Sequence, residues 1–168
     1  LYQTLKLGAT CVLLEKKFFA LPLFLLQALD RNGVTAVNWA TSAFHLAASS
    51  GALEKCVPHA LRKIVVGGEA LQARYVNMWK RAIPEAELYN MYGPTEITDV
   101  CAWFRVDRAF ADTDALPIGC PCANTRIELI DGEICVGGAG LSPGYYNAPE
   151  KTAAAFVQNP RRPQIPEV

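Results

Sequence analysis

The chain has 168 residues, of which 51% are hydrophobic and 19% are charged, and its formal net charge is zero. Such a chain can bury the core of a globular domain, which excludes an intrinsically disordered protein. Because it has no long Lys/Arg-rich run, and charge, Gly or Pro breaks its apolar runs within about 10 residues, we expect no nucleic-acid partner and no membrane partner.

The first half of the chain alternates predicted helices and strands. Gly or Asn after helix ends and Pro near helix starts mark the helices, and short apolar runs mark the strands. The expected elements are a helix over 2–7, a strand over 10–14, a helix over 21–31, a strand over 34–39, a helix capped by Thr41-Ser42 that reaches 50–51, a strand over 61–66, a helix over 71–83 and a strand over 86–91. This alternation predicts an α/β fold with a parallel sheet flanked by helices.

The helix over 71–83 has the clearest periodicity. Leu71, Tyr75, Met78 and Ala82 recur at helical spacing and are expected to form its buried face. Pro84 ends this helix, because proline cannot continue the hydrogen-bonding pattern.

In the second half of the chain, the predicted strands follow one another without long helices between them. Strands are expected over 100–106, 126–130 and 133–136, a helix over 149–157 and an extended tail over 160–166. We therefore divide the chain into an α/β part over 1–107, a polar link over 108–116 and a β-rich segment over 117–168 with a terminal helix and tail. The missing initiator Met and a start inside a helix suggest a piece of a longer protein.

Polar side chains gather in the turn that follows the strand over 86–91. Gly93-Pro94 forces a tight turn there, and open α/β sheets bind ligands at the carboxyl ends of their strands. This stretch offers an aromatic ring, an amide, two hydroxyls and a carboxylate, carried by Tyr92, Asn90, Thr95, Thr98 and Glu96. These groups suit a nucleotide with Mg²⁺, although an ordinary polar turn uses the same residue types.

Two glycine-containing stretches are further candidate sites. Gly67-Gly68-Glu69-Ala70 lies where a strand gives way to a helix, so its backbone can face a flat ligand or an anion, or it can be a simple tight turn. The run over 137–144 has neither G-x-G-x-x-G nor a Gly-Lys-Ser/Thr sequence, so it is interpreted as strand-turn backbone and not as a phosphate cradle.

Cysteine and histidine give no clear catalytic or metal-binding pattern. Most of the six cysteines lie in apolar runs, which predicts buried free thiols in a reducing, cytoplasmic location. Cys120-Pro121-Cys122 could supply half of a metal site, but no second Cys/His pair stands at a usable spacing. His45 and His59 have no sequence-local nucleophile and are expected to be structural or surface residues.

Three stretches occur in the order and spacing of one protein family. They are Lys63 to Leu71 (KIVVGGEAL), Asn90 to Glu96 (NMYGPTE) and Gly132 to Asn147 (GEICVGGAGLSPGYYN). Together they resemble the adenylation domains of nonribosomal peptide synthetases, within the adenylate-forming superfamily. The resemblance implies the second α/β subdomain of the large N-terminal part of such a domain, followed by a β-rich part of its distorted β-barrel. Ile130-Asp131-Gly132-Glu133 is shorter than the usual loop of the family, so residues could be missing there.

The resemblance also implies an activity and its site. In that family ATP and an amino acid form an aminoacyl-AMP, which passes to a carrier protein bearing a phosphopantetheine thiol. Tyr92 would stack on adenine, Asn90 would lie at its polar edge, Thr95 would bond the α-phosphate and Glu96 would help to hold Mg²⁺, so Thr95 and Glu96 are the expected catalytic residues. The wall beside the base would be formed by Gly68, Glu69 and Ala70.

The amino-acid pocket follows from the same resemblance. The family's pocket positions fall on Asn38, Val65, Gly67, Met91, Asp99 and Val100. Asp99 favours a substrate with a polar side chain, unless it turns away and pairs with Arg74, Arg105 or solvent.

Other parts of such a domain are absent from this sequence. The Pro-Lys-Gly phosphate loop, the ribose-binding Asp and the catalytic Lys of the family do not occur in it, so the chain alone is expected to be inactive without the remainder of the adenylation domain in cis. Two alternatives stay open: a fragment of an acyl- or aryl-CoA ligase, and a non-catalytic α/β module that binds a nucleotide or a partner.

Overall fold

The computed structural model describes residues 2–158, so the tail expected over 160–166 lies outside the described residues. The chain divides into two compact units, one formed by Leu1–Leu88 with Val106–Leu116 and the other by Tyr89–Arg105 with Pro117–Val168. Each unit is described by itself. The segmentation expected from the sequence, with its link over 108–116, remains a prediction.

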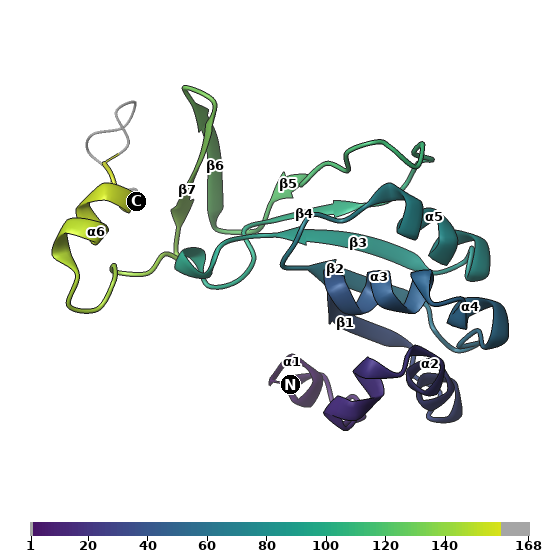
Figure 1. Ribbon diagram of the computed structural model, residues 1–168. Helices are drawn as coiled ribbons and strands as arrows, with labels where there is room; N and C mark the ends of the chain where they lie inside the picture. Colours follow the sequence, from purple (N-terminus) through teal and green to yellow (C-terminus); the bar gives the residue numbers. More distant parts are fainter. Residues whose placement is uncertain (1, 159–168) are drawn as a thin grey trace. The chain divides into compact units, whose positions relative to one another are not determined.

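The first unit contains most of the helices (Figure 1). Its elements are α1 (Tyr2–Lys6), η1 (Lys16–Ala20), α2 (Pro22–Arg31), β1 (Ala36–Ala40), α3 (Thr41–Ser49), α4 (Ala52–Lys55), β2 (Lys63–Gly67) and α5 (Ala73–Ala82), followed by the start of β3 (Glu87–Tyr92). The alternation of helix and strand expected from the sequence is confirmed in this unit from α2 onward.

The strand expected over 10–14 is wrong. These residues have no regular secondary structure, and the Leu13 side chain is 85% exposed. A short apolar run forms a strand only where a neighbouring strand can take its backbone hydrogen bonds, and no strand of the described chain pairs with this one. Cys11 in this run is also exposed, and Cys101 is the one buried cysteine among six free thiols, so most cysteines are less buried than predicted.

An aromatic cluster forms the core of the first unit. The Phe44 ring of α3 stacks on the Trp79 ring of α5 with centroids 5.2 Å apart, and the Trp39 ring of β1 meets Trp79 edge-on at 5.9 Å. The indole N–H of Trp79 donates a hydrogen bond of 3.1 Å to the Phe44 carbonyl. This cluster fixes α3 and α5 against β1, with the Trp79 indole N–H satisfied.

The buried face of α5 differs from the one predicted. Ala73, Val76 and Trp79 are its buried residues, whereas Tyr75 and Met78 are only half-buried. Both sets recur at helical spacing, so periodicity alone could not separate two adjacent stripes. The larger apolar area of Trp79 decides which stripe faces the core.

The five-stranded sheet is mixed and not wholly parallel, which corrects the prediction. Its strand order is β1-β2-β3-β4-β5, with β1 parallel to β2 but β4 (Ala102–Arg105) antiparallel to both β3 and β5 (Cys120–Pro121). The reason is the short turn between β3 and β4, because a parallel connection needs a crossover of about a dozen residues or more.

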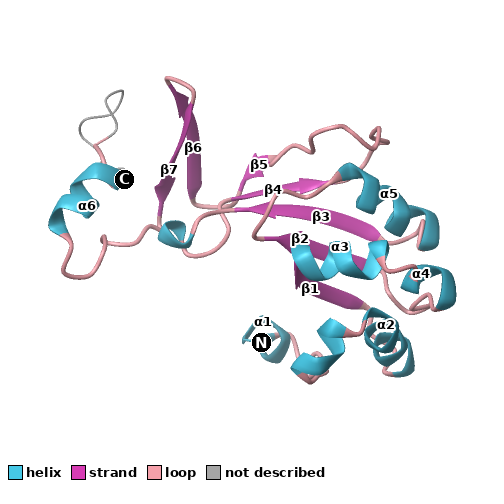
Figure 2. Ribbon diagram, in the orientation of Figure 1, coloured by secondary structure: helices cyan, strands magenta, loops and turns pink. Residues whose placement is uncertain are grey.

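The second unit adds a separate two-stranded hairpin and a short helix. Figure 2 shows the hairpin strands β6 (Thr125–Ile130) and β7 (Glu133–Gly138) and the helix α6 (Pro149–Ala155). The short helix η2 (Thr95–Ile97) belongs to the same unit. Asp131 and Gly132 join the strands with φ angles of 51° and 88°, the left-handed conformation of a two-residue hairpin turn. The shortened loop noted in the sequence therefore closes as a tight turn. No helix among the described residues is long and apolar enough to cross a membrane.

Candidate functional site

The corner after β2 belongs to the first unit and is held from inside by Thr41. Gly68, Glu69 and Ala70 are exposed there, and Gly68 has a φ of 101°, which an L side chain rarely adopts. The buried Thr41 hydroxyl lies 3.2 Å from the Gly67 carbonyl oxygen and 3.1 Å from that of Glu69, to either of which it can donate.

The structure contradicts two sequence-based expectations, one about Thr41 and one about the corner. The residue does not cap α3, because Ala40 is the N-cap residue and no side-chain cap bond forms. The corner also does not pass directly into a helix, since α5 begins only at Ala73 after the N-cap residue Gln72. Glu69 therefore lies outside the first turn of α5, and Thr41 is what shapes the corner.

Three predicted pocket residues share one face of the β1–β2 pair. Val37, Trp39, Ile64 and Val66 are buried on the helix-covered face. Asn38, Val65 and Gly67 alternate with them and are exposed or half-buried, and Asn38 lies directly beside Val65 in the register. Because strand side chains alternate between faces, these three residues form a small, open surface on one face.

The end of β3 belongs to the second unit and carries the other motif residues. Asn90 is only 6% exposed, and its Nδ2 donates a 2.9 Å hydrogen bond to the Pro117 carbonyl oxygen. Tyr92 is half-buried and Thr95 is exposed at the start of η2. One bond leaves an asparagine amide further donor and acceptor capacity, so this contact is compatible with the role expected for Asn90.

The turn from Gly93 to Cys101 is tight and strained. A Cβ on Gly93 would lie 2.4 Å from the Asp99 carbonyl oxygen, so only glycine fits. Thr98 and Asp99 have φ angles of 60° and 76°. Such left-handed residues cost roughly 1–3 kcal/mol each and persist only where the surrounding structure holds them. Asp99 is exposed and Val100 is half-buried in this turn. Strain of this kind is typical of ligand-binding turns.

The glycine-rich run over 137–144 forms hydrogen bonds with this turn and packs closely against it. The Ser142 N–H donates a 2.7 Å bond to the Glu96 carbonyl oxygen, and the Thr98 hydroxyl donates a 2.5 Å bond to the Gly140 carbonyl oxygen. A Cβ on Gly140 would lie 2.8 Å from the Ile97 carbonyl oxygen. The run is therefore backbone that packs closely on the turn, in line with its interpretation from the sequence.

The Glu96 carboxylate is bound by a residue that the sequence did not reveal. The Tyr145 hydroxyl donates a 2.5 Å hydrogen bond to Glu96 Oε1. That bond lowers the pKa of Glu96 below its ordinary value, with smaller lowering contributions from its own backbone and from Lys151. The same bond raises the pKa of Tyr145. Glu96 is therefore a charged carboxylate at neutral pH.

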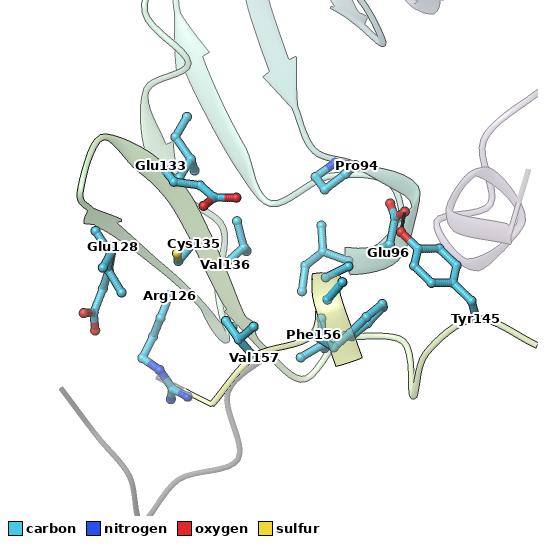
Figure 3. A pocket seen from close by; sticks show the side chains of 17 residues that line it. Pro94, Glu96, Arg126, Glu128, Glu133, Cys135, Val136, Tyr145, Phe156 and Val157 are labelled. Carbon is cyan, nitrogen blue, oxygen red and sulfur yellow. Dashed lines mark hydrogen bonds between the residues drawn. The ribbon is translucent and has the colours of Figure 1, made fainter. Parts of the chain in front are cut away.

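A cavity of about 370 Å³ adjoins this pair in the second unit. Figure 3 shows Glu96 and Tyr145 pointing toward each other at its edge. Apolar groups form much of its lining, with charged side chains at Glu96, Arg126, Glu128 and Glu133. Nothing in the sequence pattern indicated this cavity, because its lining comes from η2, β6, β7 and α6 together.

The residues present are compatible with Mg²⁺ but do not enclose it. Within residues 2–158, no group of three or more His, Cys, Asp or Glu side chains could hold a metal ion. Mg²⁺ is often bound by only one or two carboxylates together with substrate phosphates. The charged, half-buried Glu96 is therefore a donor of the right chemistry.

Both histidines make structural contacts. His45 Nε2 accepts a 3.3 Å hydrogen bond from the Gln72 N–H, and its ring packs 4.4 Å from the Tyr75 ring centroid. His59 Nδ1 lies 3.0 Å from the Asp30 carboxylate on the surface. Neither contact involves the motif residues.

Comparison with known proteins identifies the family. The family model for AMP-binding enzymes matches residues 1–146. The chain belongs to the AMP-binding enzyme family. Surfactin synthase subunit 1 of Bacillus subtilis (strain 168) is 32% identical over 171 residues, which cover 95% of this chain and 5% of that protein.

Solved structures agree with this assignment. CmiS6 matches with a TM-score of 0.85 and 26% identity, covering 98% of this chain and 42% of that chain. Holo-PA1221, a nonribosomal peptide synthetase protein containing adenylation and PCP domains, matches with a TM-score of 0.75 and 29% identity over 87% of this chain and 27% of that chain.

Within the AMP-binding family, the chain corresponds to a portion of a nonribosomal peptide synthetase adenylation domain. This confirms the family expected from the three sequence stretches. It spans only 5% of the surfactin synthase subunit. Its fold agrees with the adenylation-domain structures as a mixed five-stranded sheet with a two-stranded hairpin.

Proposed function

We propose that the chain supplies the adenine-, α-phosphate- and metal-contacting residues of a domain that activates an amino acid with ATP. The observation that carries this proposal is the strained turn after β3. It presents the half-buried Tyr92 ring, the exposed Thr95 hydroxyl and the charged Glu96 carboxylate within five residues.

Each residue has a role that its chemistry can perform. Tyr92 provides a face for the adenine base, and Asn90 is held by Pro117 so that its amide edge is fixed. The Thr95 hydroxyl donates to the α-phosphate, where charge develops when the amino-acid carboxylate attacks. Glu96 would hold Mg²⁺, which would offset negative charge on the phosphates when bound.

The corner of the first unit forms the wall beside the base. Gly68, Glu69 and Ala70 expose their backbone there, and the positive φ of Gly68 lets the backbone approach a flat ligand. We assign Asn38, Val65 and Gly67 to the amino-acid pocket because they share one open face. The family resemblance also assigns Met91, Asp99 and Val100, which belong to the second unit, to amino-acid recognition.

The finer placement within a whole enzyme follows from the same family. We infer that the chain is the second α/β subdomain of the large N-terminal part with a segment of the β-barrel. The remainder of the adenylation domain would lie in the same polypeptide. The aminoacyl-AMP would then pass to a carrier-protein thiol, as the adenylation and PCP domains of PA1221 suggest by analogy. A cytoplasmic location remains an expectation.

The test is amino-acid-dependent ATP–pyrophosphate exchange by the full-length protein that contains this chain. A panel of amino acids is compared with fatty and aryl acids, with CoA thioester formation measured in parallel. We expect exchange with amino acids, strongest for one with a hydroxyl, amide or amine in its side chain, and no CoA thioester.

The outcomes separate the alternatives. CoA thioester formation without amino-acid exchange would favour the acyl- or aryl-CoA ligase, and nucleotide binding without either reaction would favour the non-catalytic module. Asp99→Ala tests the pocket assignment within the same panel. A preference for Val, Leu or Phe that Asp99→Ala leaves unchanged would remove Asp99 from the pocket.

A further inference from the structure

Tyr145 contacts Glu96 from a distant part of the sequence, at a separation of 49 positions. The contact lies within the second unit, at the edge of the cavity in Figure 3. A hydroxyl that donates to one carboxylate oxygen fixes the rotation of that carboxylate and leaves acceptor capacity for a metal ion.

The Tyr145 side chain is itself held in place on several sides. Its ring meets the Phe156 ring edge-on, with centroids 5.4 Å apart, and the Lys151 ammonium lies 4.1 Å from its ring centroid. Its backbone N–H donates a 2.9 Å bond to the Thr152 hydroxyl of α6. The hydroxyl therefore reaches Glu96 from a ring whose position does not depend on Glu96.

The backbone of the two segments is joined as well. Ser142, three residues before Tyr145, donates its N–H to the Glu96 carbonyl oxygen at 2.7 Å. Gly144 has a φ of 131°, and a Cβ there would lie 2.5 Å from Thr152 Cγ2. The chain thus bends closely against α6 immediately before Tyr145, which directs the ring toward the turn.

We propose that Tyr145 is a positioning residue that orients the Glu96 carboxylate for the divalent metal ion that accompanies the nucleotide. This inference rests on the proposed function. Tyr145 would act through Glu96, as outer partners of metal ligands do when they fix a ligand's orientation. The proposal gives a functional role to Tyr145, the last residue of the run LSPGY.

The experiment measures Mn²⁺ binding to the full-length protein in the presence of a non-hydrolysable ATP analogue, by electron paramagnetic resonance. Tyr145→Phe removes only the hydroxyl and keeps the ring contacts with Phe156 and Lys151. Tyr146→Phe is the matched control, because the Tyr146 side chain is 100% exposed. We expect Tyr145→Phe to raise the Mn²⁺ dissociation constant roughly tenfold and Tyr146→Phe to leave it unchanged.

A double-mutant cycle separates positioning from general structural damage. In a Glu96→Gln background, Tyr145→Phe should change the Mn²⁺ dissociation constant less than about twofold, because the carboxylate it orients is gone. An equal loss in both backgrounds would mean a structural role and would overturn the inference, as would a wild-type dissociation constant for Tyr145→Phe alone.

Mn²⁺ binding by the wild-type protein distinguishes a failure of this inference from a failure of the proposed function. If wild type binds Mn²⁺ with the nucleotide analogue and Tyr145→Phe binds equally well, only the role of Tyr145 is wrong. If wild type binds no Mn²⁺ with the analogue, the proposed function fails and the inference fails with it.

Discussion

Thr41 and Asn90 are the buried polar side chains among the described residues, with exposed fractions of 0% and 6%. Each donates a hydrogen bond to loop backbone beside the candidate site, Thr41 to the corner at Gly67 and Glu69 and Asn90 to Pro117. Because a buried polar group is stabilising only when it is paired, both residues hold one loop geometry in preference to others.

Replacing Thr41 by Val should therefore destabilise the first unit. The substitution keeps the side-chain shape but leaves loop carbonyls without their donor, which costs roughly 1–3 kcal/mol of unfolding free energy. Urea denaturation of the 168-residue chain measures the loss, and Thr41→Ser, which keeps a hydroxyl, should recover most of it. Equal stability of Thr41→Val and wild type would mean that the bonds contribute nothing.

The elements of the first unit were largely predictable because each carries its own local pattern. Pro22 starts α2 and Asn32 follows its end, and the alternating burial of β1 and β2 follows the two-residue period of a strand. The predictions of secondary structure and burial failed where the contacts that determine them involve residues distant in sequence. The run over 10–14 found no neighbouring strand, and the buried stripe of α5 was set by Phe44 and Trp39.

The corrected face of α5 makes a quantitative prediction. Trp79→Ala should cost roughly 3–5 kcal/mol of unfolding free energy, because it removes a buried ring from the aromatic cluster. Met78→Ala should cost clearly less, since Met78 is only half-buried, although it belongs to the stripe first expected to face the core. Chemical denaturation measures the free energy of unfolding of the two variants. A larger loss of stability for Met78→Ala would contradict the corrected face and favour the stripe predicted from the sequence.

For the whole molecule, the motif residues were visible in the sequence and their supports were not. Asn90, Tyr92, Thr95 and Glu96 stand in one short stretch. Their residue types suit a nucleotide but also an ordinary polar turn, and the family resemblance was needed to favour the nucleotide site. Tyr145 reaches Glu96 across 49 positions, and a tyrosine after a glycine-rich run has no local pattern that predicts this contact. Residues of the predicted site occur in both compact units.

Amino-acid-dependent ATP–pyrophosphate exchange by the full-length protein, compared between wild type and Glu96→Gln, tests the proposed chemistry most directly. The substitution keeps the side-chain size but removes the charge that we propose holds Mg²⁺ where negative charge develops. We predict exchange by wild type and roughly hundredfold lower turnover by Glu96→Gln. Turnover by Glu96→Gln equal to wild type at saturating Mg²⁺, or no exchange by wild type with any amino acid, would contradict the proposal.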